Sequence, residues 1–156
     1  MSVVQETRTV KGSLASAWEA IADLRAVEDW HPNVAKVTIL TERNRGIGAA
    51  RRLEFHDGRS VVETVVEEAE RSFTKVEMTE AAMMNSAFVT ISTKERSADT
   101  TDVTFAIDYS LQYGPIGWLL DRVMMRGMFS KVFDTAMAGL SYHLETGKVV
   151  VDSVPE

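Results

Sequence analysis

The chain contains no cysteine among its 156 residues. This absence excludes disulfide bonds, cysteine nucleophiles and cysteine-ligated zinc, and it favours a reducing compartment, so we expect a cytoplasmic protein. The sequence also lacks any apolar run of the ~20 residues that a transmembrane helix needs. No apolar segment typical of a signal peptide is visible near its start. We therefore expect no stable insertion into a membrane.

Positive charge and metal-binding residues are also scarce. The 17 Lys and Arg are outnumbered by 23 Asp and Glu, and the net charge of −6 argues against nucleic acid as a partner. Only three His are present, scattered along the chain, and no phosphate-binding loop, dinucleotide fingerprint or zinc-protease motif occurs. The sequence therefore predicts no metal and no cofactor.

What is present is typical of a globular protein. Hydrophobic residues make up 45% of the chain and charged residues 26%. No linker rich in Pro, Gly or Ser divides the sequence, and no segment repeats. We expect a single domain over residues 1–156.

The first forty residues combine one strand with two short helices. Residues 3–10 have the composition of a strand. Ser13 is a candidate N-cap for a helix whose apolar residues recur at helical spacing. The segment "RAVEDW" (25–30) predicts a second short helix that ends before Pro32, which places His31 at a turn.

Six further strands follow. Gly46 and Gly48 punctuate one turn, Asp57-Gly58 is a hairpin signal, and "RSADT" (96–100) joins the last two strands. The predicted strands cover residues 34–40, 49–55, 59–69, 72–78, 86–95 and 101–111.

The last segment predicts a helix of ~30 residues, with Pro115 in its first turn and Gly147 as its stop signal. Gly127 within it indicates a bend or a point of close packing. The expected apolar stripe is Leu119, Val123, Phe129, Val132, Phe133, Ala136, Met137, Leu140 and Leu144.

This order of elements predicts an α+β fold. Successive hairpins imply an antiparallel sheet of seven strands. A sheet of this size has to curl around the single long helix if both are to bury their apolar faces. We expect the helix to leave part of the enclosed space unfilled.

The element order and three motifs resemble the START-like, or polyketide cyclase/dehydrase (SRPBCC), superfamily with the helix-grip fold. The motifs are "AWEAIADLRAVEDWHP", "GIGAARRLEF" followed by "DG" and "VVETVVEEAERSFTKVEM", and "GPIGWLLDRVMMRGMFSKVFDTAMAGLSYHLE". The resemblance implies an internal pocket for a small hydrophobic or amphipathic molecule, lipid-like or polyketide-like. It names neither the molecule nor a reaction.

Two charged residues are candidate polar anchors in this pocket. Strand alternation places Arg51 on the face of Ala49, Leu53 and Phe55. Similarity to helix-grip receptors implies that Glu63 also faces inward, so the two would neutralise each other or meet a polar ligand group. The alternative is that Arg51 bends back to solvent and Glu63 faces outward. The expected ligand-binding residues are Trp30, Arg51, Leu53, Phe55, Glu63, Val76, Met78, Phe88, Phe105, Tyr109, Met125, Phe129, Phe133 and Met137.

Three functions are compatible with these residues. The first is a noncatalytic binder or carrier of a hydrophobic molecule. The second is a cyclase or dehydratase with His31, Glu63 and Tyr109 as acid/base candidates, although His31 could also be a turn residue in solvent. The third is a module that regulates a protein partner.

Methionines gather near the predicted rim of the fold. Met83 and Met84 lie between strands, and Met124, Met125 and Met128 lie in the first half of the long helix. They could gate the pocket, touch a membrane transiently, form a homodimer contact or fill the core.

Overall fold

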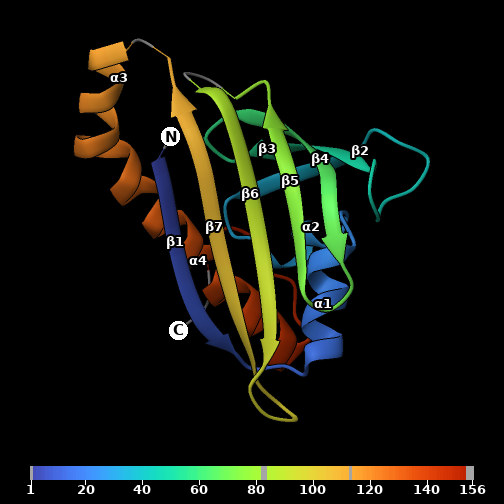
Figure 1. Cartoon of the computed structure of the whole chain (residues 1–156). Helices are drawn as coiled ribbons and strands as arrows, with labels where there is room; N and C mark the ends of the chain where they lie inside the picture. The colour runs from blue at the N-terminus through green and yellow to red at the C-terminus, as the bar shows by residue number, and fades with distance from the viewer. Residues whose placement is uncertain (1, 82–83, 113, 154–156) are drawn as a thin grey trace.

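The computed structural model describes residues 2–81, 84–112 and 114–153. Seven strands form one antiparallel sheet in the order β1-β7-β6-β5-β4-β3-β2, so the first and last strands of the chain are neighbours (Figure 1). The strands are β1 (Ser2–Val10), β2 (Val34–Ile39), β3 (Ala50–Phe55), β4 (Ser60–Ala69), β5 (Phe73–Thr79), β6 (Met84–Glu95) and β7 (Thr101–Leu111).

The helical elements occur where the sequence predicts them. Ser13 caps the first helix by accepting a hydrogen bond from the Ser16 amide, and Gly147 ends the last helix in the left-handed conformation, at φ 73°. The helices are α1 (Leu14–Ala22), α2 (Val27–Trp30), α3 (Gly114–Leu120) and α4 (Arg126–Thr146), with a π-helical segment η1 (Asp121–Met125) between the last two.

The sheet curves around α4, which contacts β1 and β7 on one side and α1 and α2 on the other (Figure 1). The inward side chains of the sheet and the buried face of α4 form one hydrophobic cluster. The helix-grip prediction is therefore confirmed. Over the described residues, no helix is both long and apolar enough to cross a lipid bilayer.

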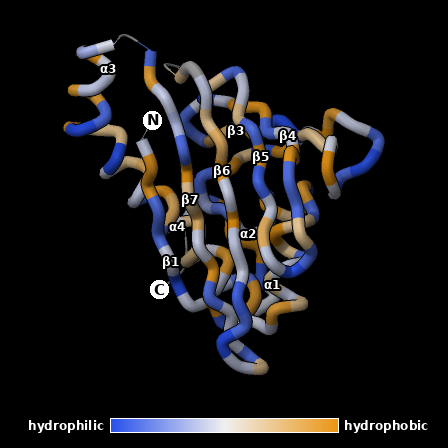
Figure 2. The backbone as a smooth tube through the Cα atoms, in the orientation of Figure 1, coloured by the Kyte–Doolittle hydropathy of each residue, from blue (hydrophilic) through white to orange (hydrophobic). Residues whose placement is uncertain are grey.

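Strand alternation decides which side chains enter this cluster. On β7, Val103, Phe105, Ile107 and Tyr109 are buried, while the residues between them are half-buried on the outer face, and Figure 2 shows the polar and apolar positions alternating along the strands. Phe88 was expected among the inner residues. It instead lies opposite Glu77 and Asp108, on the outer face, because it is out of phase with Ala87 and Val89.

The long helical segment differs from its prediction at its front end. From Phe129 onward the residues of the apolar stripe are buried, or half-buried at Val132 and Leu144, but Leu119 and Val123 are 55% and 71% exposed. The irregular backbone lies at η1 and not at Gly127, which lies in regular helix with no atom within 4 Å of the position a Cβ would take. The segment therefore packs on the sheet mainly through its second half, and in front of that at single positions such as Gly117 and Asp121.

Gly139 marks the closest approach of α4 to the rest of the fold. A Cβ at this position would overlap the carbonyl oxygen of Trp30 and lie 2.8 Å from the Pro32 ring. Only glycine lets the helix pass this close to the corner between α2 and β2.

Candidate functional site

Arg51 and Glu63 lie directly opposite each other on β3 and β4, and both point into the interior. Glu63 Oε1 is 2.7 Å from Arg51 Nη2 and accepts a hydrogen bond of 2.9 Å from Nε, while Nη1 donates to the Leu24 carbonyl at 2.8 Å. Both residues are at most 7% exposed. Of the two arrangements left open by the sequence, the structure has the inward pair, and its charges neutralise each other.

His31 lies beside this ion pair and is also buried. It ends α2, and its ring stacks on Trp30 at a centroid distance of 5.8 Å and meets the edge of Phe55 at 6.5 Å. Its Nδ1 accepts a hydrogen bond from the Asn33 amide at 3.2 Å. Loss of hydration on burial, and then the charge of Arg51, lowers the pKa of His31 to about 4. His31 is therefore a neutral core residue near pH 7, not a turn histidine in solvent.

A row of aromatic rings runs from His31 through the interior to the other end of the sheet. Successive centroids are 4.9 to 6.5 Å apart, within the range of ring–ring contact. The row consists of Phe55, His31, Trp30, Phe105, Phe133, Phe129 and Tyr109. Along this row the interior is occupied by side chains, whereas the sequence analysis expected an unfilled space there.

Asp121 closes the far end of the row. The Tyr109 hydroxyl donates a hydrogen bond to Asp121 Oδ1, the Ser2 hydroxyl donates to Oδ2 at 2.5 Å, and Arg126 Nε lies 3.6 Å from Oδ2. Burial and the bond to Asp121 raise the pKa of Tyr109. Burial alone would raise the pKa of Asp121, but the hydrogen bonds from Ser2 and Tyr109 and the charge of Arg126 outweigh it and lower that pKa.

Asp121 is a site residue that the sequence does not single out. The only available signal was a single acid inside the apolar run "GWLLDRVMM", which helical periodicity alone does not place. The π-helical turn and the approach of Ser2 from β1 bury it. π-helical turns occur often at functional sites.

A pocket of about 110 Å³ opens beside this carboxylate. Gly117 allows the close packing of its wall, because a Cβ there would overlap the Gln112 carbonyl oxygen. The lining residues are Ser2, Tyr109, Ser110, Leu111, Gly117, Trp118 and Asp121. Since Tyr109 also contacts Phe129, the pocket adjoins the aromatic row.

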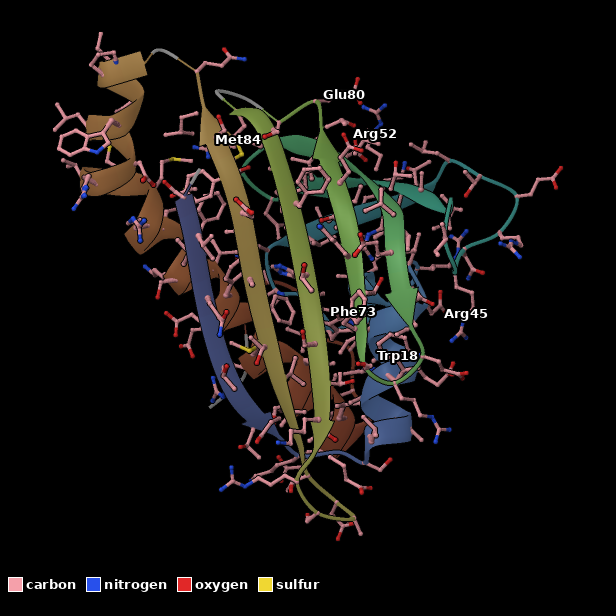
Figure 3. All side chains as sticks on the ribbon, in the orientation of Figure 1. Trp18, Arg45, Arg52, Phe73, Glu80 and Met84 are labelled. Atoms are coloured by element: carbon pink, nitrogen blue, oxygen red, sulfur yellow. The ribbon has the colours of Figure 1, made fainter. Side chains whose placement is uncertain are left out.

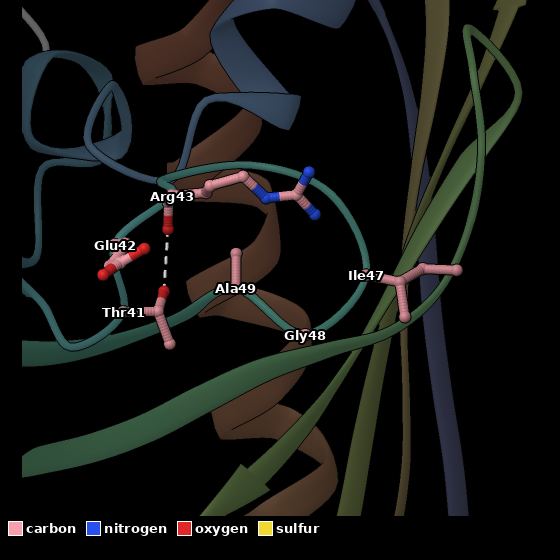
Figure 4. A pocket seen from close by; sticks show the side chains of 6 residues that line it. All are labelled: Thr41, Glu42, Arg43, Ile47, Gly48 and Ala49. Carbon is pink, nitrogen blue, oxygen red and sulfur yellow. Dashed lines mark hydrogen bonds between the residues drawn. The ribbon is translucent and has the colours of Figure 1, made fainter.

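A second, larger hollow of about 380 Å³ lies at the surface under the loop between β2 and β3 (Figure 4). The Thr41 hydroxyl donates to the Arg43 carbonyl at 2.7 Å and shapes this loop. The hollow is lined by Thr41, Glu42, Arg43, Ile47, Gly48 and Ala49. None of the ligand-binding residues expected from the sequence lies in it.

The remaining expected residues are distributed through the core and its margin. Leu53, Val76 and Met137 are buried, and Phe55, Met78 and Met125 are partly buried against the same cluster. Of the other methionines, Met84, at the start of β6 (Figure 3), and Met128 are partly buried against the core, Met124 is 60% exposed, and Met83 lies outside the described residues.

Outward-facing charges near the interior pair are separate from it. Arg52 on β3 points to the other face and reaches Glu80 at 3.4 Å (Figure 3). In the part of the chain that the structure describes, no three His, Asp or Glu side chains converge as a metal site.

Comparison with solved structures finds the same architecture in proteins of low sequence identity. XoxI from Bacillus cereus shares 17% identity with a TM-score of 0.75, over 94% of this chain and 97% of its own. A START superfamily protein from Mycobacterium smegmatis shares 19% with a TM-score of 0.72, over 91% and 98%. The ZhuI aromatase/cyclase from Streptomyces sp. R1128 shares 17% with a TM-score of 0.68, over 92% and 93%.

These identities show a common fold and no more, and no curated protein sequence matches the chain. The sequence itself matches, over residues 1–145, the family described as polyketide cyclase / dehydrase and lipid transport. The match covers the sheet and nearly all of α4, including both polar ends of the aromatic row. The chain belongs to this polyketide cyclase/dehydrase and lipid transport family.

Proposed function

We propose that the protein binds a small hydrophobic or amphipathic molecule between the sheet and α4, as a single ligand-binding domain. The aromatic row carries this proposal, because it is a continuous apolar surface with a polar group at each end. A guest would replace contacts between rings with contacts to its own apolar body. Arg51 at one end and the Tyr109 hydroxyl at the other would orient its polar atoms.

The pocket beside Asp121 is the proposed mouth of this site. It adjoins Tyr109, the last ring of the row, and its outer wall comes from α3 and η1. This wall is held to the ends of β7 and β1 by Gly117 and Asp121, so an outward movement that releases these two contacts would open a path toward Phe129. Entrance of a guest therefore requires the aromatic rings to move, in contrast to a preformed cavity.

An acid/base enzyme of the cyclase or dehydratase type is the alternative, and the Streptomyces relative carries such a name. Efficient proton transfer needs a group whose pKa lies near the working pH. Each of the three shifted pKa values of this site moves further from pH 7. The pKa of His31 falls to about 4, that of Tyr109 is raised and that of Asp121 is lowered. These shifts favour binding over catalysis. The cysteine-free composition supports a cytoplasmic location for the binder.

The test compares two alanines of the sheet. Ala87 is 1% exposed and lies opposite Tyr109 and Met78 on the inner face, whereas Ala106 lies on the outer face of β7. We expect Ala87→Leu to fill space beside Tyr109 and to weaken binding of the apolar fluorophore N-phenyl-1-naphthylamine by about tenfold, a loss of ~1.4 kcal/mol. Ala106→Leu should bind like the wild type.

Native mass spectrometry of the freshly purified wild type should also detect a bound small molecule that Ala87→Leu lacks. Circular dichroism would establish that both variants are folded. Equal affinities for the fluorophore in all three proteins would show that the interior is not the binding site.

A further inference from the structure

The helical segment in front of α4 exposes an unusual amount of apolar surface. Half of the ten large apolar side chains that are exposed in the described part of the chain fall within Gly114–Met125, which we term the α3–η1 arm. They are Ile116, Trp118, Leu119, Val123 and Met124, and each is 55% to 71% exposed. Single exposed apolar residues are common, but such a concentration on one short segment marks an interaction surface.

The arm is placed for contact with something outside the molecule. It stands at the edge of the sheet beyond β1, and its exposed side is not covered by any other described element (Figures 1 and 2). Its inner side is held by Gly117 and Asp121, which are buried against the end of β7 and the start of β1. The apolar side chains therefore project outward from an anchored helix.

The exposed charges on the arm and on the start of α4 next to it are opposite in sign to the net charge of the whole chain. Between residues 114 and 131 the only carboxylate is Asp121, which is 6% exposed and already bound by Ser2, Tyr109 and Arg126. The cations Arg122, Arg126 and Lys131 are exposed. A molecule of net charge −6 thus presents a local surface that is apolar and basic.

We propose that the α3–η1 arm docks the protein on the surface of an anionic phospholipid bilayer. A short helix with exposed aromatic and aliphatic residues and basic neighbours is suited to the boundary between headgroups and acyl chains. Tryptophan side chains such as Trp118 favour this boundary, because one end of the ring is apolar and the other can form a hydrogen bond. The guanidinium carbon of Arg122 lies 5.1 Å from the Trp118 ring centroid, so Arg122 is placed to reach lipid phosphates.

A second copy of the chain fits the arm less well. In a two-fold symmetric dimer the same patch meets itself, so the basic group Arg122, Arg126 and Lys131 would be brought near the same basic group of the second copy. An anionic bilayer instead has negatively charged headgroups that can bind the cations, and acyl chains that can bury the apolar side chains of the arm. The docking surface stands independently of what the interior binds.

Tryptophan fluorescence can detect docking of the arm on a bilayer. Trp18 and Trp30 are 1% and 2% exposed, whereas Trp118 is 60% exposed, so a change of environment at the arm is reported by Trp118 alone. We expect the emission of the full chain to shift to the blue with vesicles of mixed phosphatidylglycerol and phosphatidylcholine, and not with pure phosphatidylcholine. Trp118→Phe should remove the shift.

Sedimentation with the same vesicles tests separately how the basic residues and the apolar residues contribute to binding. Arg122→Glu reverses one charge and should weaken binding to anionic vesicles by about tenfold. Leu119→Ser/Val123→Ser should weaken it at least as much. The matched control Ile47→Ser/Val151→Ser removes apolar residues of 60% and 69% exposure elsewhere and should bind like the wild type.

Three results would overturn the proposal. The first is equal sedimentation of the wild type and Leu119→Ser/Val123→Ser, and the second is no binding of the wild type to either vesicle. The third is a concentration-dependent dimer in analytical ultracentrifugation that Leu119→Ser/Val123→Ser abolishes, which would assign the arm to contact between copies of the chain.

Discussion

Glu63 and Arg51 form a buried ion pair in the interior, and each charge depends on the other. Breaking a buried pair by removing one partner is far more costly than replacing both, because the remaining charge is left without compensation. We expect Glu63→Gln to lower the free energy of unfolding by about 3 kcal/mol. Urea denaturation followed by circular dichroism measures this loss.

The double variant Arg51→Leu/Glu63→Leu is the informative comparison. With both charges gone, most of the stability lost in Glu63→Gln should return. If the double variant is less stable than Glu63→Gln, the pair contributes more to the fold than charge compensation explains.

His31 makes stability depend on pH. Its pKa falls from 6.5, the ordinary value of a histidine, to about 4 in the folded protein, so the unfolded chain binds the proton more tightly. The contribution of neutral His31 is complete above pH ~6.5, is lost as the pH falls from there toward ~4, and changes no further below that. Between about pH 7.5 and about pH 5 the loss from this group amounts to roughly 2 kcal/mol.

Between the same two pH values, the free energy of unfolding should fall by roughly 2 kcal/mol less in His31→Gln than in the wild type. His56 is exposed, so His56→Gln serves as the control and should retain the wild-type dependence. An identical pH dependence in the wild type and His31→Gln would mean that the imidazole is not buried as a neutral group.

At the scale of single elements, α4 provides two glycines with opposite expectations. Alanine normally stabilises a helix by up to about 1 kcal/mol relative to glycine. At Gly127 nothing lies near a new methyl group, so Gly127→Ala should raise the melting temperature. At Gly139 the methyl group would meet the Trp30 carbonyl and the Pro32 ring, so Gly139→Ala should destabilise by about 2 kcal/mol despite the better helix former.

Differential scanning calorimetry of both variants measures these shifts. If Gly139→Ala were as stable as Gly127→Ala, α4 would not be packed tightly against the corner between α2 and β2. The comparison therefore tests how tightly α4 packs against this corner.

Strands and helices differ in how well the sequence predicts them here. Each strand is bounded by turn residues with a physical role, such as Gly58 at φ 89°, so the predicted limits fall within two residues of those observed. The front of the long helical segment is marked by Pro115, and the segment begins at Gly114 as expected, but no marker shows which face of its first turns is buried. Its buried positions there, Gly117 and Asp121, are a glycine and an acid, which hydrophobic periodicity cannot identify.

For the whole molecule, the element order was enough to predict the helix-grip architecture, because one long helix and seven strands have few ways to bury their apolar faces. The inward orientation of Arg51 also follows from alternation. The contact among Ser2, Tyr109 and Asp121 does not, since it joins positions 119 residues apart through an irregular helical turn. Similarly, no pattern showed that aromatic rings would fill the space along α4.

The pairing of β1 with β7 has a consequence for how the chain folds as it is made. β1 leaves the ribosome before the rest of the sheet, yet its hydrogen-bonding partner β7 begins at Thr101 and the helix that contacts it, α4, begins at Arg126. β1 must therefore remain without its partner until β7 has also been synthesised. Contacts of such long sequence separation slow folding, so the pairing of β1 with β7 should be a late step in folding.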